Sequence, residues 1–310
     1  MKIAVIGGTG FVGRHLCLYL ARQDYQVVSA ARHPVPELFS NENIDFRRLD
    51  LLAPDACRID LEGVDCVVYL AARTSVMEDT VSDPLEEYRK LNLEAALNVA
   101  ESGASQGIRR FIYLSSVKVN GSESETPFRE TDTPVPVEDY AISKYEAEQA
   151  LTEFAGKAGL ELVILRPPLV YGPGAVGNFA RLREAVERGR WLPLGAVENR
   201  RSYIAIDNLV QVIEQCIRHP RAAGQQFLVS DGEDVSVGRF IELLGEALGK
   251  PVYLLRVPVW ILRLAGTLLG KTEYVNRLCG SLQLDISKIR RELDWEPEVT
   301  MRQGLRNLKG

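Results

Sequence analysis

The chain has 310 residues, 46% of them hydrophobic, and a net charge of −5. This composition excludes a largely disordered chain, and the acidic balance gives no sign of a nucleic-acid partner. The length predicts one large α/β unit with an added lobe. Three dispersed histidines predict no metal site. The five cysteines form no C-x-x-C pair, so we expect reduced thiols in a cytoplasmic protein; they are Cys17, Cys57, Cys66, Cys216 and Cys279.

Short β-branched segments alternate with segments of helical period through the first two-thirds of the chain. We predict strands at residues 2–6, 26–30, 44–49, 66–71, 110–115, 162–166 and 226–229. Helices are predicted between them, among others at residues 12–23, 85–106 and 143–158. This alternation predicts an α/β fold with a Rossmann-type, doubly wound parallel sheet covered by helices on both faces.

The pattern changes at residue 168, where Pro/Gly-rich loops begin, and a helical region follows from residue 234. We therefore assign residues 1–167 to a nucleotide-binding domain, with 201–231 returning to it. Residues 168–200 and 232–310 are assigned to a smaller, mostly helical substrate-binding lobe. The apolar segment 257–270 contains Arg263 and is shorter than the roughly 20 residues of a membrane span. We expect an amphipathic packing helix there rather than a membrane-surface helix.

The turn after the first strand carries the clearest binding motif, Gly7-Gly8-Thr9-Gly10-Phe11-Val12-Gly13. Glycines at this place let the backbone approach a pyrophosphate, which then lies at the N-terminus of the following helix. The alternative is an ordinary tight turn, but the strand–turn–helix context favours dinucleotide binding by these residues.

The end of the second strand bears on the choice of cofactor. An acid there would bind the adenosine ribose of NAD, whereas this chain has Arg32, which suits the 2′-phosphate of NADP. An arginine merely exposed at a strand end is the alternative. We predict NADP(H) as the favoured cofactor and keep NAD(H) as the other candidate. Further predicted cofactor contacts are Asp50 and Leu51 at the adenine and Leu70, Ala71, Ala72 and Arg73 after the fourth strand.

Tyr140 and Lys144 indicate a catalytic site. They are four residues apart at the start of a helix and so lie on one face. A nearby ammonium favours the phenolate and lowers the pKa of Tyr140 from about 10, so that Tyr140 can exchange a proton with a carbinol or carbonyl. Ser115 and Ser116 end a strand, where a hydroxyl can polarise the same oxygen. Each feature alone is usually structural, but their order after the glycine turn points to catalysis.

With these motifs the chain resembles the extended short-chain dehydrogenase/reductase family, in the branch that acts on nucleotide sugars. It is most similar to the UDP-HexNAc 4-epimerases and 4-ketoreductases of bacterial O-antigen pathways, along essentially the whole chain. The resemblance implies that Ser116, Tyr140 and Lys144 are catalytic. Implied cofactor contacts are Asn92 and Pro167, in addition to Tyr140 and Lys144. Implied substrate contacts are Lys118, Asn178 and Arg201, with Arg201 at the diphosphate of a UDP-sugar.

Departures from the family's patterns narrow the expected reaction. Val117 and Lys118 replace the Asp-Glu pair of the 4,6-dehydratases, which argues against dehydration. Arg32, Leu169 and Ser281 depart from UDP-glucose 4-epimerases. We therefore expect a reductase for the C4 ketone of a UDP-4-keto-6-deoxy-HexNAc, in lipopolysaccharide precursor synthesis. The alternatives are a UDP-sugar 4-epimerase with retained NAD and a catalytically silent NADP-binding sensor. We also expect a homodimer through helices 85–106 and 143–158, and no membrane span.

Overall fold

A parallel seven-stranded sheet forms the centre of the computed structural model, which describes residues 1–38, 40–53, 59–74 and 83–309. The strand order is β3-β2-β1-β4-β5-β6-β10. The strands are β1 (Lys2–Ile6), β2 (Gln26–Ala31), β3 (Ile44–Arg48), β4 (Cys66–Tyr69), β5 (Arg110–Leu114), β6 (Glu161–Arg166) and β10 (Gln225–Leu228). Each lies within two residues of its predicted bounds, and the Rossmann-type fold is confirmed. The predicted thiol Cys57 lies outside the described residues.

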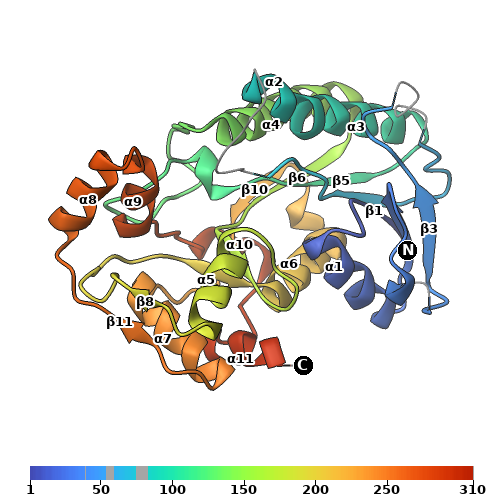
Figure 1. Ribbon diagram of the computed structural model, residues 1–310. Helices are drawn as coiled ribbons and strands as arrows, with labels where there is room; N and C mark the ends of the chain where they lie inside the picture. The colour runs from blue at the N-terminus through green and yellow to red at the C-terminus, as the bar shows by residue number, and fades with distance from the viewer. Residues whose placement is uncertain (39, 54–58, 75–82, 310) are drawn as a thin grey trace.

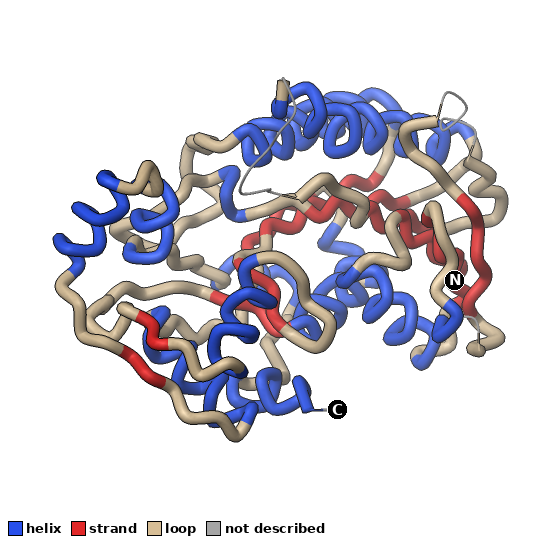
Figure 2. Tube along the Cα trace, viewed as in Figure 1, coloured by secondary structure: helices blue, strands red, loops and turns tan. Residues whose placement is uncertain are grey.

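Helices cover both faces of this sheet (Figures 1 and 2). One face carries α1 (Phe11–Arg22) and α6 (Ile206–Arg218), and the other carries α2 (Pro84–Arg89), α3 (Ala95–Ser105) and α4 (Asp139–Ala158). Neighbouring residues of a strand face opposite sides, so Ile3 and Val5 enter one hydrophobic cluster while Ala4 and Ile6 enter the other. The two clusters together hold the helices onto the sheet.

The predicted helix 85–106 is interrupted by a π turn, η2 (Lys90–Glu94). The carbonyls of Leu91 and Asn92 in this turn accept hydrogen bonds of 2.7 Å from the hydroxyls of Tyr69 and Tyr113. Buried tyrosine hydroxyls need such hydrogen-bond partners. Hydrophobic periodicity carries no sign of these contacts between strand and helix, so it did not predict the π turn. The predicted helix 143–158 also begins earlier, at Asp139.

A third hydrophobic cluster lies apart from the sheet. It is built around Phe179, Tyr203 and Phe240, and the rings of Tyr203 and Phe240 stack with centroids 4.1 Å apart. Its helices are α5 (Asn178–Glu187), α7 (Val237–Leu248) and α11 (Met301–Arg306). Helix α5 falls in a segment that we expected to be loops. Two short sheets accompany it, β7 (Leu169–Tyr171) with β9 (Tyr203–Ala205) and β8 (Trp191–Leu192) with β11 (Tyr253–Leu254).

The segment that contains α10 (Ser287–Leu293) packs differently from the rest of the C-terminal region. Leu284, Ile289, Leu293 and Trp295 belong to the cluster that also holds strands of the main sheet. We had assigned these residues to the smaller lobe. The boundaries of the lobe remain a prediction. The packing of α10 favours grouping residues 284–295 with the nucleotide-binding domain rather than with the smaller lobe.

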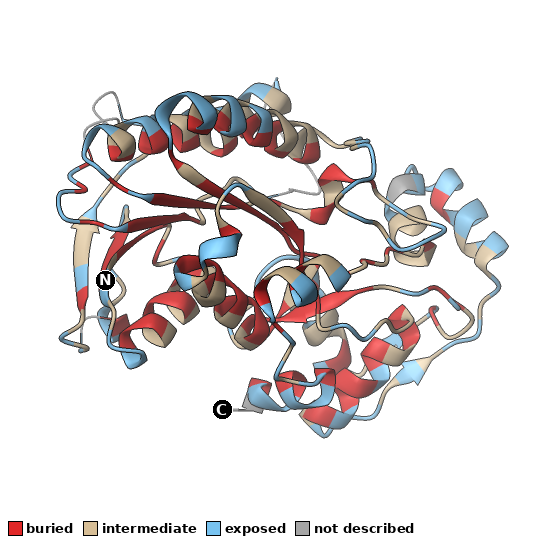
Figure 3. Cartoon of the chain, turned by 180° about the vertical axis from the view of Figure 1, so that it is seen from behind, coloured by how far each residue is buried: buried red, intermediate tan, exposed pale blue. Residues whose placement is uncertain are grey.

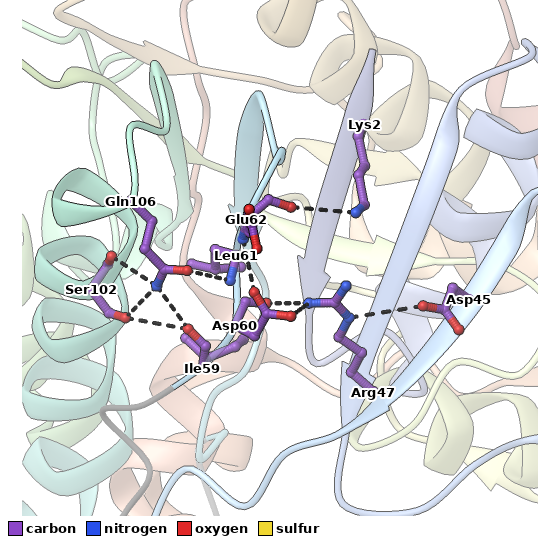
Figure 4. A network of polar contacts seen from close by, with 9 residues as sticks. All are labelled: Lys2, Asp45, Arg47, Ile59, Asp60, Leu61, Glu62, Ser102 and Gln106. Carbon is purple, nitrogen blue, oxygen red and sulfur yellow. Dashed lines mark hydrogen bonds and ion pairs between the residues drawn. The ribbon is translucent and has the colours of Figure 1, made fainter.

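A polar network fastens the segment that leads into β4 (Figure 4). Arg47 of β3 donates to the carboxylate of Asp60 at 2.8 Å and also to its carbonyl. On the other side, Gln106 at the end of α3 accepts from the amide of Leu61 at 2.8 Å and donates to the carbonyl of Ile59. None of these residues is among the predicted catalytic or binding residues, and their polar groups bond to one another, so we assign the network a structural role.

The apolar segment 257–270 forms α8 (Val259–Leu268), followed by α9 (Thr272–Cys279). Of the ten residues of α8 only Gly266 is buried, so the expectation of an ordinary packing helix is wrong for most of its surface. Within the described ranges, every helix is too short or too polar to cross a bilayer. The same residues contain no cluster of His, Cys, Asp or Glu side chains suited to a metal ion.

Candidate active site

The glycine turn joins the carboxyl end of β1 to α1. Gly7 has a φ of +85°, and a Cβ there would lie 2.8 Å from the amide nitrogen of Ala71, which follows β4. A Cβ on Gly13 would lie 2.2 Å from the carbonyl oxygen of Gly7. Both positions therefore require glycine, and they leave bare backbone beside the first turn of α1.

The N-terminus of α1 is suited to an anion. No side chain caps it at Gly10, and its first turn contains no acidic residue. The free N–H groups and the helix dipole attract negative charge. The turn lies where the sheet order reverses, between β1 and β4, which is the usual crevice for a dinucleotide. The residues present therefore fit the predicted cofactor.

Replacing Gly13 with alanine tests whether the glycine turn has room for a side chain at this position. We expect Gly13→Ala to cost about 1–3 kcal/mol of unfolding free energy and to weaken dinucleotide binding, because the new methyl group must displace backbone atoms of the turn. Gly156→Ala is the matched control, since its Cβ on the exposed side of α4 meets nothing within 4 Å. We expect the control to stabilise the protein slightly. Urea unfolding and fluorescence titration measure both effects, and equal behaviour of the two variants would contradict the assignment.

Asn92 connects the loop after β4 to α4. Its Oδ1 accepts from the amide of Arg73 at 3.0 Å, and its Nδ2 donates to the carbonyl of Arg73 and to Oγ of Ser143 at 3.3 and 3.0 Å. The side chain is fully buried. We predicted Asn92 as a cofactor contact; the structure shows that its amide holds protein segments in place, so any effect on the cofactor passes through the Arg73 loop.

Ser116 and Tyr140 come together from two elements. Ser116 follows β5, Tyr140 opens α4, and both residues are half-buried. Burial raises the pKa of Tyr140 to about 12, and a hydrogen bond with the Ser116 hydroxyl opposes this rise. The ring of Tyr88 meets that of Tyr140 edge-on, with centroids 6.0 Å apart. The arrangement keeps Tyr140 as a neutral phenol near pH 7.

Lys144 is almost completely buried one helical turn after Tyr140. Its Nζ donates to the carbonyl of Leu114 at 2.9 Å and lies 4.5 Å from the ring centroid of Tyr113. Burial lowers the pKa of Lys144 to about 7, while the charge of Glu148 acts in the opposite direction. We expected the ammonium of Lys144 to lower the pKa of Tyr140. That expectation is wrong for this structure, because burial dominates both groups.

The lowered pKa of Lys144 predicts a pH-dependent stability. The folded pKa is about 7 and the unfolded value about 10.4. Between these values the unfolded chain binds the proton and the folded chain does not, so the unfolding free energy rises with pH. We expect wild-type protein to gain stability relative to Lys144→Met from about pH 7 to about pH 10. Lys157→Met, at an exposed lysine of the same helix, is the control.

The measurement is urea unfolding of nucleotide-stripped wild type and both variants across this pH range. Below about pH 7 the difference between wild type and Lys144→Met should be nearly constant, because both states of wild type then bind the proton. The Lys157→Met difference should change little at any pH in the series. A flat difference for Lys144→Met would contradict the lowered pKa.

Sequence reasoning missed a buried polar network behind Lys144. Glu148, Arg166 and Asn120 are all at least 97% buried. Arg166 Nε donates to Glu148 at 2.9 Å, a second nitrogen pairs with the same carboxylate, and a third donates to Asn120 Oδ1 at 2.9 Å. A signal was present: Tyr140, Lys144 and Glu148 follow one another at intervals of four and share a helix face.

A series of contacts between charged side chains leads from Tyr140 to α9. Lys118 Nζ pairs with Glu138 at 2.6 Å and lies 5.8 Å from the ring centroid of Tyr140. Arg277 of α9 pairs with the other oxygen of Glu138 at 3.2 Å. Arg201 donates to the carbonyls of Arg277 and Gly280 at 2.7 and 2.8 Å. Glu138 and Arg277 carried no sequence signal that we recognised.

The predicted role of Arg201 at a diphosphate changes in one respect. Its guanidinium already fastens the end of α9, with one nitrogen engaged by two carbonyls. Burial also lowers the pKa of Arg201. The remaining nitrogens of a guanidinium can still bind a phosphate, so diphosphate binding stays a prediction and a structural role is added to it.

The other predicted residues lie at the carboxyl ends of the strands or beyond. Arg32, Asp50 and Asn178 are exposed, and Asp50 accepts from the amide of Leu52 at 3.2 Å. Leu51 packs against the cluster under α3 and α4. Pro167 is buried, and its carbonyl accepts from the amide of Val117 at 3.0 Å, which aligns the segment after Ser116. Their contacts with a cofactor or substrate remain predictions.

Comparison with known proteins adds independent findings. Residues 3–238 match the NAD dependent epimerase/dehydratase family. The chain is 42% identical over 309 residues to the UDP-glucose 4-epimerase of Vibrio cholerae, covering 98% of this chain and 93% of that protein. It is 28% identical to the GDP-6-deoxy-D-mannose reductase of Pseudomonas aeruginosa, covering 98% and 95%.

A solved structure matches the fold along the whole chain. The UDP-glucuronic acid 4-epimerase of Bacillus cereus, in complex with NAD, superposes with a TM-score of 0.81 at 23% identity, covering 100% of this chain and 99% of that one. At this identity the match concerns the fold alone.

Proposed function

Because the chain belongs to the NAD dependent epimerase/dehydratase family, an extended short-chain dehydrogenase/reductase family of enzymes, we propose that it is a UDP-sugar 4-epimerase. The observation that carries this proposal is the identity of 42%, along nearly the whole chain, to a UDP-glucose 4-epimerase. Our main expectation from the sequence was a 4-ketoreductase, which we now place second. The proposed substrates are UDP-glucose or UDP-GlcNAc and their C4 epimers.

The side chains divide the chemical work at C4. When bound, a nicotinamide supplies a place for the C4 hydride to go and to return from. Tyr140 would hold the proton of the 4-hydroxyl through its phenolic oxygen, and Ser116 would donate to the same sugar oxygen. Lys144, fixed on the carbonyl of Leu114, would present its ammonium to the ribose side of the cofactor. The glycine turn and the N-terminus of α1 would bind the pyrophosphate.

A specific observation keeps the 4-ketoreductase as the second candidate. A ketone reduction consumes a reduced cofactor and needs Tyr140 as a proton donor. Arg32, exposed directly after β2, favours this candidate, because its charge suits the 2′-phosphate of NADPH. The reductase among the relatives is consistent with this candidate.

Product analysis separates the two candidates. Purified protein is incubated with UDP-glucose and, separately, with UDP-GlcNAc, and the C4 epimers are quantified by NMR. The epimerase proposal expects conversion to an equilibrium mixture without net consumption of NADPH or NADH. No conversion, together with stoichiometric NADPH consumption on a UDP-4-keto-6-deoxy-HexNAc, would overturn it in favour of the reductase. Nucleotide binding without turnover on any of these sugars would favour a silent sensor.

Arg32 gives a test of cofactor choice. It is exposed directly after β2, where its charge can reach a 2′-phosphate. We expect Arg32→Asp to weaken NADPH binding by about tenfold or more, and to leave NADH binding unchanged or improved. Isothermal titration with both cofactors measures this, with Arg22→Gln at the exposed end of α1 as control. An unchanged preference in Arg32→Asp would show that Arg32 does not select NADP(H).

A further inference from the structure

Exposed large hydrophobic side chains are concentrated on helix α8 and its flanking segments. Of the fourteen large hydrophobic side chains exposed among the described residues, eight lie in a stretch of 22 residues; these are Tyr253, Leu255, Trp260, Ile261, Leu264, Leu268, Leu269 and Tyr274. The helix lies at one extremity of the molecule, away from the main sheet (Figures 1 and 3). Clustered apolar exposure of this kind marks an interaction surface rather than ordinary surface composition.

Helical spacing divides α8 into two faces. Val259 and Leu262 pack against the third hydrophobic cluster, and Gly266 allows the close approach of Val275 from α9. Trp260, Leu264 and Leu268, spaced by four, form the outer stripe and are 67%, 54% and 79% exposed. The helix is thus held by its inner face and presents an apolar stripe on its outer face.

The charged residues along this stretch are mainly cationic. Residues 250–274 contain four cations, Lys250, Arg256, Arg263 and Lys271, and one acid, Glu273, although the whole chain has a net charge of −5. All four cations are exposed. An exposed apolar stripe with a tryptophan and flanking cations matches the interface of an anionic bilayer, where the cations meet headgroups and the apolar side chains enter the acyl boundary.

We propose that α8 docks onto an anionic lipid surface. At ten residues it is about 15 Å long, so it lies in the interface and does not span. A second copy of this chain fits the surface less well, because a symmetric contact would bring together two surfaces with the same excess of positive charge. The adjacent α9 supplies Arg277, which pairs with Glu138 near Tyr140, so docking brings the substrate side of the site close to the membrane.

Vesicle flotation tests the proposal with the full chain and needs no substrate, so its result does not depend on the proposed function. Wild-type protein is mixed with vesicles of phosphatidylcholine alone and with vesicles containing about one-third phosphatidylglycerol. We expect binding to the anionic vesicles that falls with added salt. Leu264→Glu should weaken this binding by about tenfold or more, and Arg263→Gln/Lys271→Gln should weaken it on anionic vesicles.

Leu52→Glu is the matched control, since Leu52 is 57% exposed and follows β3, the edge strand of the main sheet; it should bind like wild type. Circular dichroism and thermal unfolding verify that Leu264→Glu is folded. Absence of wild-type binding to anionic vesicles would overturn the proposal. So would equal binding by Leu264→Glu and wild type. A wild-type dimer in solution that Leu264→Glu dissociates, without vesicle binding, would instead assign the surface to a second copy of the chain.

Discussion

Replacing Tyr140 with phenylalanine is expected to lower kcat by about 10²–10⁴-fold while leaving dinucleotide binding intact. The substitution removes only the hydroxyl that exchanges a proton with the sugar oxygen, and the ring that packs edge-on against Tyr88 stays. Steady-state kinetics on the UDP-sugar that wild type turns over gives kcat, and titration with NADH or NADPH gives the cofactor affinity.

Tyr145→Phe is the matched control for this prediction, because Tyr145 is a partly exposed tyrosine of the same helix. We expect its kcat to stay close to wild type. A Tyr140→Phe enzyme that keeps more than about one-fifth of the wild-type kcat would remove Tyr140 from the proton-transfer role. Loss of cofactor binding in that variant would point instead to a defect in the fold of the site.

The second large effect is expected at the buried Arg166–Glu148 ion pair. Arg166→Met should lower the unfolding free energy by about 3–5 kcal/mol, because it leaves the carboxylate of Glu148 buried without its cation. The double variant Arg166→Met/Glu148→Leu should recover much of this loss, since it removes both charges together. Urea unfolding of the wild type and the three variants of the cycle measures the coupling.

A surface pair on the same helix provides the control for the ion-pair cycle. Lys157 and Glu153 are 74% and 71% exposed, and breaking this pair with Lys157→Met should cost less than about 1 kcal/mol. If Arg166→Met costs no more than Lys157→Met, the buried pair does not hold α4 onto β6. If the double variant is no more stable than Arg166→Met, the loss of unfolding free energy comes from lost packing or from the lost hydrogen bond to Asn120, and not from the unpaired charge.

Both predictions concern side chains on the same face of α4. Helix α4 carries Tyr140, Lys144 and Glu148 on one face, and the ion pair fixes the last of these to the end of β6. Glu148 also acts against the lowering of the pKa of Lys144. Glu148 and Arg166 are therefore positioning residues, and a change in the pH profile of Glu148→Gln would distinguish that role from simple support of the fold.

The sequence determined the sheet, its glycine turn and the order of the catalytic motifs. Strands and glycine turns depend on short-range patterns, such as the continuous apolar run of β1 and the steric limits at Gly7 and Gly13. The resemblance to a known family supplied the enzyme class. The choice between reductase and epimerase was not contained in these motifs, since both reactions use the same side chains.

Only the tertiary structure decided which long-range partners each side chain meets. It placed Arg201 on the carbonyls of α9, Asn92 between two protein segments and Lys118 on Glu138. It also reversed the expected effect on the pKa of Tyr140, because burial depends on every element packed around the ring. Periodicity likewise showed that α8 is apolar, but whether an apolar stripe faces a core or solvent depends on what the rest of the chain packs against it, and here its outer face is left exposed.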